Sequence, residues 1–177
     1  MMMRGEGCHL EALHFGWAPQ FAGFLEAGVN FTHTFTGSIP MRTVDVEKEW
    51  EKERLAGSIQ WAIFGGSEFI GTTGLYSHRD IYRSWEFRIL IGKPGELGKG
   101  IGTQVTRMVV DWGFKRLNAH RIELGVNCLN LGAVKCYRNV GFKDEGVLRD
   151  AIFIDGHYTD VIRMSVLEDE WRTAQSS

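Results

Sequence analysis

The sequence contains few cysteines and few prolines. Three of each occur among 177 residues, and the cysteines, Cys8, Cys128 and Cys136, form no C-x-x-C pair. An odd number with this spacing argues against a disulfide framework and against a zinc knuckle. Three prolines do not make a proline-rich linker. We therefore expect reduced thiols and a cytoplasmic location.

The sequence also lacks a long apolar run and a large excess of either charge. No stretch reaches the roughly 18 apolar residues of a transmembrane helix, and residues 1–7 contain no apolar segment of signal-peptide length. Lys and Arg number 20 against 22 Asp and Glu, which gives a net charge of −2. This balance predicts neither nucleic-acid binding nor attachment to a membrane surface.

The sequence does contain enough apolar material for a globular core. Hydrophobic residues make up 44% of the chain and aromatic residues 12%, which excludes a disordered protein. The length of 177 residues fits one domain, and no repeat or linker divides it. We expect a single domain over 1–177.

Strand and helix patterns alternate along the chain. Apolar spacing and helix-forming composition predict helices over 17–27, 43–55 and 133–139, and a long helix that starts at Ile101. Two-residue alternation and turn signals predict strands over 8–14, 58–64, 68–76, 85–91, 121–126, 147–154 and 157–167. Gly65-Gly66 and Asp155-Gly156 are the expected hairpin turns.

Three glycines, Gly98, Gly100 and Gly102, separate the strand over 85–91 from the long helix. A backbone without Cβ atoms can bend sharply and approach a ligand closely. The first N–H groups of a helix lack partners within it and carry the positive end of the helix dipole. The segment therefore predicts an anion site suited to phosphate, to which Lys99 adds charge. The alternative is a tight connection in which the glycines serve turning alone.

Two widespread phosphate-binding motifs do not fit this segment. A P-loop requires Ser or Thr directly after Gly-Lys, where Gly100 stands. The dinucleotide motif G-x-G-x-x-G requires its third glycine one residue later than Gly102. A plain nucleotide-binding domain is therefore not favoured.

Two segments resemble the GNAT superfamily of acyl-CoA-dependent N-acyltransferases. Leu97-Gly98-Lys99-Gly100-Ile101-Gly102 resembles the family's phosphate loop, Q/R-x-x-G-x-G/A, except at Leu97. About thirty residues later, 130–142 resembles the second family motif, Asn-x-x-Ala-x-x-x-Tyr-x-x-x-Gly-Phe. The likeness extends over 69–171. The tail over 155–164 resembles the RimJ/RimL branch, which includes ribosomal-protein N-terminal and polyamine acetyltransferases.

The resemblance implies a single-domain α/β GNAT fold with a mixed, mostly antiparallel central sheet flanked by helices. It also implies transfer of an acetyl group from acetyl-CoA to a primary amine by direct attack on the thioester. The acceptor stays open among protein N-termini, polyamines and other small amines. A homodimer is common among such relatives. Cys136 is interpreted as a small buried side chain rather than a nucleophile.

The resemblance makes Glu86 the candidate general base, because it lies eleven residues before Leu97, the offset at which relatives carry theirs. A water chain leading to a base is the alternative mechanism, and a strand carboxylate paired with Arg88 is the alternative interpretation. His78, His120 and His157 are weaker candidates for the base.

Tyr137 is the candidate general acid. It lies at i+3 and i+4 from Val134 and Ala133, so its ring can pack inward while its hydroxyl faces the sulfur of the thioester. Its hydroxyl is protonated at neutral pH and can donate to the departing thiolate. The alternative is an ordinary tyrosine of the core.

The cofactor-binding residues follow from the same resemblance. Backbone N–H groups at Ile89, Leu90 and Ile91 are expected to meet the pantetheine arm and the thioester carbonyl. The loop, the first helical turn and the second motif supply the other candidates: Leu97, Gly98, Lys99, Gly100, Ile101, Gly102, Thr103, Asn130, Ala133 and Tyr137. Asn130 is also expected to cap its helix. Lys135, Arg138 and Asn127 are weaker candidates.

A competing hypothesis is a GNAT fold that senses acyl-CoA, or binds a partner protein, without turnover. No metal is expected, because no H-E-x-x-H or other ligand spacing connects the six histidines. Aromatic residues gather in the N-terminal third, and core packing explains them more readily than a substrate cage. These residues are Trp17, Phe21, Phe24, Phe31 and Phe35.

Overall fold

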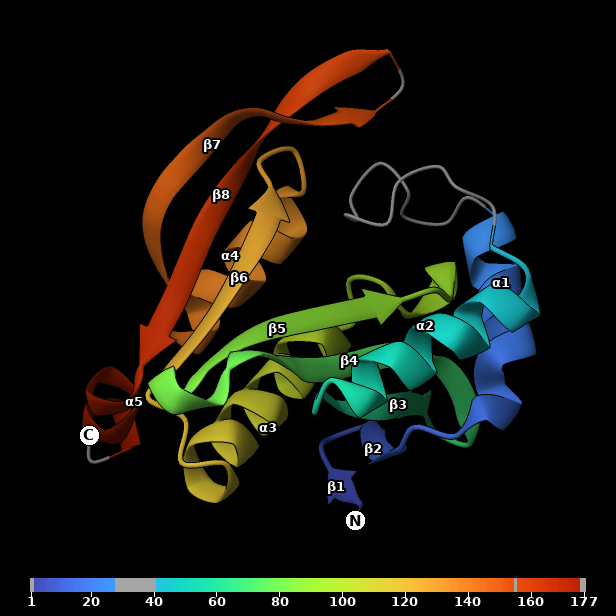
Figure 1. The fold of residues 1–177 in the computed structure, drawn as a ribbon, viewed down its shortest axis with the longest axis horizontal. Coiled ribbons are helices and arrows are strands. Elements are labelled where there is room, and N and C mark those ends of the chain that lie inside the picture. Colours follow the sequence, from blue (N-terminus) through green and yellow to red (C-terminus); the bar gives the residue numbers. More distant parts are fainter. Residues whose placement is uncertain (1, 28–40, 155, 176–177) are drawn as a thin grey trace.

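The computed structural model describes residues 2–27, 41–154 and 156–175, without the side chains of 78–80. Its centre is a sheet of eight strands in the order β1-β2-β3-β4-β5-β6-β8-β7 (Figure 1). The strands are β1 (Met3–Arg4), β2 (Cys8–Ala12), β3 (Ile59–Gly65), β4 (Glu68–Arg79), β5 (Ser84–Ile91), β6 (Arg121–Asn127), β7 (Lys143–Ile154) and β8 (His157–Leu167). The helices are α1 (Ala18–Glu26), α2 (Thr43–Leu55), α3 (Ile101–Arg116), α4 (Leu131–Val140) and α5 (Glu168–Gln175).

The sheet is mixed and mostly antiparallel, as the resemblance implies. Neighbouring strands of the described sheet run antiparallel except β5 and β6, which are parallel. A parallel pair needs a crossover connection, and α3 provides it. The sheet order and this crossover helix agree with the GNAT fold that the resemblance implies.

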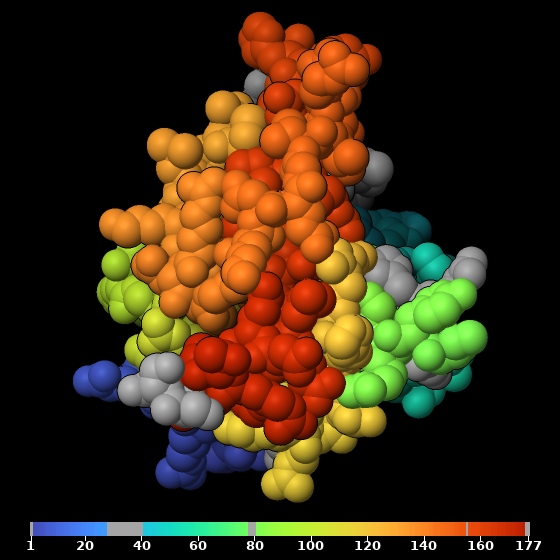
Figure 2. All heavy atoms as spheres, turned by 90° about the vertical axis from the view of Figure 1, so that its left-hand side faces the viewer, coloured from blue at the N-terminus to red at the C-terminus, as the bar shows by residue number. Residues whose placement is uncertain are grey.

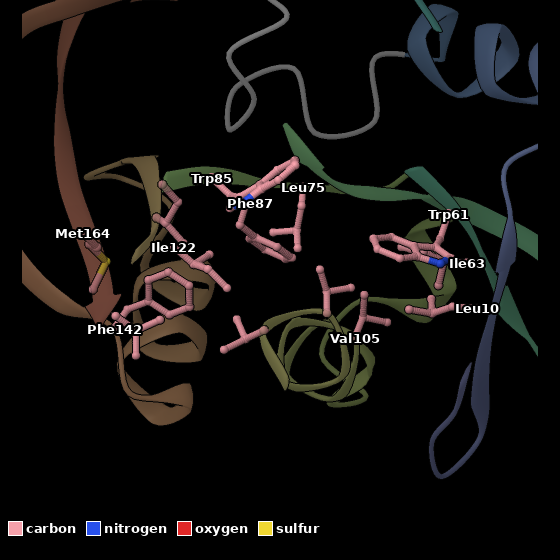
Figure 3. Close-up of a cluster of buried hydrophobic side chains, with 14 of the residues drawn as sticks. Leu10, Trp61, Ile63, Leu75, Trp85, Phe87, Val105, Ile122, Phe142 and Met164 are labelled. Carbon is pink, nitrogen blue, oxygen red and sulfur yellow. The ribbon is translucent and has the colours of Figure 1, made fainter. Parts of the chain in front are cut away.

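The long helix α3 covers one face of the sheet because its apolar residues form one stripe. Val105 and Val109 are fully buried, and Trp112 packs edge-on against Trp61 of β3 with the ring centroids 5.0 Å apart. Figure 3 shows Val105 among side chains that the strands contribute to this core. Each such aliphatic side chain contributes about 1.5–3 kcal/mol when fully buried.

Helices α1 and α2 cover the opposite face. Phe21 of α1 and Trp50 of α2 meet with ring centroids 5.3 Å apart and pack in a second cluster with Phe64 and Phe69. Trp17 and Phe24 stack on Phe69 at 5.1 and 5.8 Å, so core packing is confirmed for these aromatic residues. Phe31 and Phe35 lie outside the described residues.

The C-terminal part differs most from the sequence-based expectation. Strand β7 begins at Lys143, four residues before the predicted start, because its polar first residues pair with β8. The β7–β8 hairpin extends beyond the body of the molecule and dominates the face in Figure 2. Asp155 of the predicted turn lies outside the described residues.

No helix among the described residues is long and apolar enough to span a membrane.

The sequence pattern predicts neither β1 nor α5. Strand β1 is only two residues long and pairs with β2. Helix α5 is held by tertiary contacts that a local pattern does not reveal. Its Trp171 stacks on Phe114 of α3 with the ring centroids 5.2 Å apart, and its indole Nε1 donates to Asp111 Oδ1 at 2.6 Å.

Candidate active site

Strands β5 and β6 pair over three residues and then separate. Ser84 to Glu86 lie opposite Arg121 to Glu123, whereas β5 continues to Ile91 and remains paired with β4 along that length. The backbone of Ile89, Leu90 and Ile91 therefore borders an opening in the sheet. The Gly92 N–H bonds to Ile70 of β4, so by alternation the Leu90 N–H also faces β4. Of the three predicted donors, only Ile89 and Ile91 direct their N–H groups toward the opening.

The glycine turn lies at the same opening, between β5 and α3. Gly98 and Gly100 have φ angles of 77° and 82°, in the left-handed region that favours glycine. A Cβ atom at either position would meet nothing within 4 Å, so the turn faces open space. Gly100 precedes the first turn of α3, whose N–H groups point outward from the helix end. This geometry fits a diphosphate.

A cavity of about 980 Å³ joins these features. Leu97, Gly98, Gly100, Gly102 and Thr103 line it from the turn and α3, and Ile89, Leu90 and Ile91 line it from β5. It also reaches Trp50 and Glu53 of α2, on the other face of the sheet. The cavity thus crosses the sheet where β5 and β6 separate.

Two predicted cofactor residues do not line this cavity. The side chain of Ile101 is 5% exposed and belongs to the core around α3, so only its backbone is available. Lys99 turns to Glu96, with Nζ 3.0 Å from Oε1. Lys135 does line the cavity, whereas the guanidinium of Arg138 pairs with Asp144 at 2.6 Å.

Tyr137 of α4 borders the cavity with its ring packed edge-on against Phe87 of β5, the ring centroids 6.1 Å apart. Burial raises the pKa of the Tyr137 hydroxyl well above its usual value, and the neighbouring Cys136 thiol adds to the effect. The hydroxyl therefore stays protonated at neutral pH and can serve as a hydrogen-bond donor.

The second motif begins at Asn130, which caps α4 as predicted. Its side-chain Oδ1 accepts a hydrogen bond from the Ala133 backbone N–H at 3.0 Å. Asn130 and Ala133 both line the cavity, so the cap also lies at its border. Cys136 lines it too, and its sulfur accepts from Thr103 Oγ1 at 3.3 Å. Asn127 is buried and accepts from Thr159, away from the cavity lining.

Glu86 borders the other end of the cavity, on the face covered by α2. Its Oε2 accepts a hydrogen bond from Arg88 Nη2 at 2.8 Å, so the pairing considered from the sequence is present. Arg88 Nη1 also donates to Glu53 of α2 at 3.2 Å, and its guanidinium lies over the Tyr76 ring, 4.2 Å from the centroid. Sequence reasoning missed Glu53 and Tyr76 because α2 and β4 carry them far from both motifs.

The histidines considered as bases are not part of this arrangement. His120 and His157 are exposed and do not line the cavity, and the side chain of His78 lies outside the description. Within the described ranges, no three His, Cys, Asp or Glu side chains are grouped so that they could hold a metal ion.

The acetyltransferase (GNAT) domain model matches residues 16–143. The chain belongs to the GNAT acetyltransferase family. The match includes the glycine turn, Glu86 and Tyr137, so the features that form the cavity lie within the family domain.

Among its relatives are two bacterial spermidine N(1)-acetyltransferases. The protein from Escherichia coli K12 is 35% identical over 104 residues, which cover 59% of this chain and 55% of that protein. The one from Vibrio cholerae is 39% identical over 102 residues, which cover 58% of each. The matched part of the chain thus spans a little more than half the length of these curated relatives.

A solved structure shows the same fold over nearly the whole chain. The spermidine N-acetyltransferase of Vibrio cholerae in complex with CoA and spermine superposes with a TM-score of 0.84 at 28% identity, covering 94% of this chain and 98% of that one. The comparisons support the GNAT family and spermidine acetyltransferases as relatives, but they do not support the RimJ/RimL branch.

Proposed function

We propose that this protein transfers an acetyl group from acetyl-CoA to a primary amine of a polyamine such as spermidine. The observation that carries the proposal is the cavity that crosses the sheet where β5 and β6 separate. One end has a helix N-terminus suited to phosphate, and the other has carboxylates suited to an ammonium group. The spermidine acetyltransferases among the relatives support the same acceptor class.

The donor end has the groups that acetyl-CoA needs. The turn from Gly98 to Gly102 and the first turn of α3 offer backbone N–H groups to the diphosphate, and the open space at Gly98 and Gly100 leaves room for it. The backbone N–H groups of Ile89 and Ile91, which face away from β4, are available to the pantetheine arm and to the thioester carbonyl. Asn130 and Ala133 border the path of that arm.

The reaction proposed here is direct attack of the amine on the thioester. An alkyl amine is mostly protonated at pH 7, and freeing its lone pair costs about 4.6 kcal/mol. Glu86, directly or through water, takes the proton from the amine. The amine nitrogen forms the new bond to the carbonyl carbon, the carbon–sulfur bond breaks, and the Tyr137 hydroxyl donates its proton to the sulfur. The second proton that the nitrogen loses as the amide forms returns Tyr137 to its neutral state, directly or through water.

The acceptor end favours a cation with more than one amino group. Glu49 and Glu53 of α2 line it together with Glu86, and Trp50 and Tyr76 add aromatic surface. Carboxylates and aromatic faces attract ammonium groups. A peptide N-terminus carries one such charge, whereas a polyamine carries several along a narrow chain, which suits a cavity with acidic residues on α2.

The proposal is tested with purified protein, acetyl-CoA and a panel of amines, with release of the CoA thiol as the readout. We expect thiol release with spermidine and spermine. The control acceptor is spermidine acetylated on both primary amines, which should give none. Peptides with free N-termini and an aminoglycoside complete the panel.

Two results would overturn the proposal in different ways. Turnover of peptides but not of polyamines would move the acceptor to protein N-termini. Thiol release from no amine, with a CoA-dependent rise of about 5–11 °C in the melting temperature at 100 times the Kd, would favour the sensor hypothesis.

A further inference from the structure

The guanidinium of Arg88 is held by side chains of three different elements. Glu86 of the same strand accepts from it at 2.8 Å and Glu53 of α2 at 3.2 Å. The Tyr76 ring of β4 lies beneath it, with 4.2 Å between the guanidinium carbon and the ring centroid. All four residues line the cavity.

The surroundings of Arg88 are those of a site for an organic cation. Two carboxylates and an aromatic face are the groups that bind ammonium and guanidinium ions. Burial, against the opposing charge of Arg88, raises the pKa of Tyr76 to about 12, so its ring carries a neutral hydroxyl. Glu53 is fixed further by Ser58, whose Oγ donates to Oε2 at 3.1 Å. In the cage formed by Glu53, Glu86 and Tyr76, Glu53 is thus fixed by a contact other than that with Arg88.

The Arg88 side chain is more exposed to solvent than the two carboxylates that bind it. The Arg88 side chain is 48% exposed, against 19% for Glu53 and 16% for Glu86. A long side chain at the mouth of a cavity can move its charged end into water, whereas the two carboxylates, fixed on α2 and β5, cannot. Arg88 can therefore be displaced by a competing cation without unfolding either element.

We infer that Arg88 is a specificity-determining residue that occupies the subsite for a second amino group of the acceptor. The inference rests on the proposed function and specifies how its acceptor end selects substrates. The reacting amine reaches Glu86, and the second charge of a diamine or polyamine must displace the guanidinium from Glu53, whereas a monoamine has no second charge to place there. Arg88 thus lowers the preference of the protein for polyamines over monoamines.

The test compares R88Q and R88K with the wild type. Gln keeps the length of the side chain in part but removes the positive charge of Arg88 that both carboxylates bind. For R88Q we expect the KM for spermidine to fall about three- to tenfold relative to the KM for 1-aminobutane. R88K, which keeps the charge without the planar fork, should lie between R88Q and the wild type.

The matched control is R54Q. Arg54 of the same cavity-bordering helix pairs with Glu51 at 2.7 Å in solvent and does not line the cavity, so R54Q removes the same charge outside the cage. It should leave both KM values at the wild-type level. Adding E53Q to R88Q should raise the KM for spermidine again, because one of the two carboxylates that bind the cation is then neutral.

Calorimetric titration of spermidine into wild type and R88Q without acetyl-CoA separates this inference from the proposed function. Tighter binding to R88Q supports the inference even if no variant turns over an amine, and in that case the proposed acetyl transfer alone fails. Equal or weaker binding of spermidine to R88Q overturns the inference, whatever the turnover. Loss of activity with acceptors that carry a carboxylate would instead make Arg88 an anion-binding residue.

Discussion

Glu86 of β5 and Glu123 of β6 lie opposite each other in the last paired row of the two parallel strands. Each carboxylate is held by arginine: Glu86 by Arg88 at 2.8 Å, and Glu123 by Arg121 and Arg163, both at 2.9 Å. Like charges directly opposite across strands repel each other, and the arginines offset that repulsion. Beyond this row the strands separate and the cavity begins, so the pair marks the boundary between sheet and site.

The glycine turn gives a first prediction. G100V should weaken CoA binding at least about tenfold, because a side chain would stand where backbone N–H groups face the diphosphate. It should also cost about 1–2 kcal/mol of stability, since φ at Gly100 is 82°. G66V is the control: Gly66 has φ 62° in the β3–β4 turn, also faces open space and does not line the cavity. Equal CoA affinity of G100V and G66V by calorimetry would contradict the role of the turn.

The proton donor gives a second prediction. Y137F should lower kcat about 10²-fold while the Kd for CoA stays nearly unchanged, because only the proton transfer to sulfur is lost. Y158F removes a hydroxyl from an exposed tyrosine of the β7–β8 hairpin and should keep the wild-type kcat. If Y137F turned over at the wild-type rate, Tyr137 would be a packing residue only.

Buried tyrosines make stability depend on alkaline pH. The folded state raises the pKa of Tyr76 to about 12 and also raises that of Tyr137, in both cases mainly through burial. An unfolded tyrosine loses its proton near pH 10, so the folded state holds more protons above that pH. The stabilisation is complete below about pH 10 and is lost as the pH rises toward 12. Urea unfolding from pH 8 to 11 should show a shallower loss for Y137F than for the wild type, and identical slopes would contradict it.

The Glu145 carboxylate, at the base of the β7–β8 hairpin, should make the stability of the protein depend on acidic pH. Hydrogen bonds from Arg121, and secondarily from Ser165, lower the pKa of Glu145 to about 2. This contribution is present above the ordinary value near 4.5 and is lost as the pH falls through about 2. E145Q should cost about 1 kcal/mol or less at pH 7, since the side chain is 38% exposed. The difference from the wild type should vanish near pH 2, and a constant difference would argue against the pair.

The local spacing of apolar residues predicts most helices and strands of this fold, because the residues that define each of them are close together in the sequence. The helix predicted over 43–55 is α2 without a shift, and the stripe from Ile101 is the buried side of α3. Helix α5 escapes prediction because Trp171 holds it through contacts with α3 sixty residues earlier in the chain. The early start of β7 depends on β8, which follows it.

For the site too, features formed by residues close together in the sequence are predicted, and features formed by distant residues are not. The glycine turn and the cap at Asn130 are local motifs, and the sequence predicts both. The cage around Arg88 joins Glu53 to a strand 35 residues later, and only the packing of α2 on the sheet brings them together. A single domain over 1–177, a homodimer and a cytoplasmic location stay predictions.

The most direct test of the central claim is a crystal structure of the protein with CoA. We predict the diphosphate against the N–H groups between Gly98 and Thr103, the pantetheine arm along β5 in the opening toward β6, and the sulfur within hydrogen-bond distance of the Tyr137 hydroxyl. A diphosphate bound elsewhere, or β5 and β6 closed on each other beyond Glu86, would contradict it.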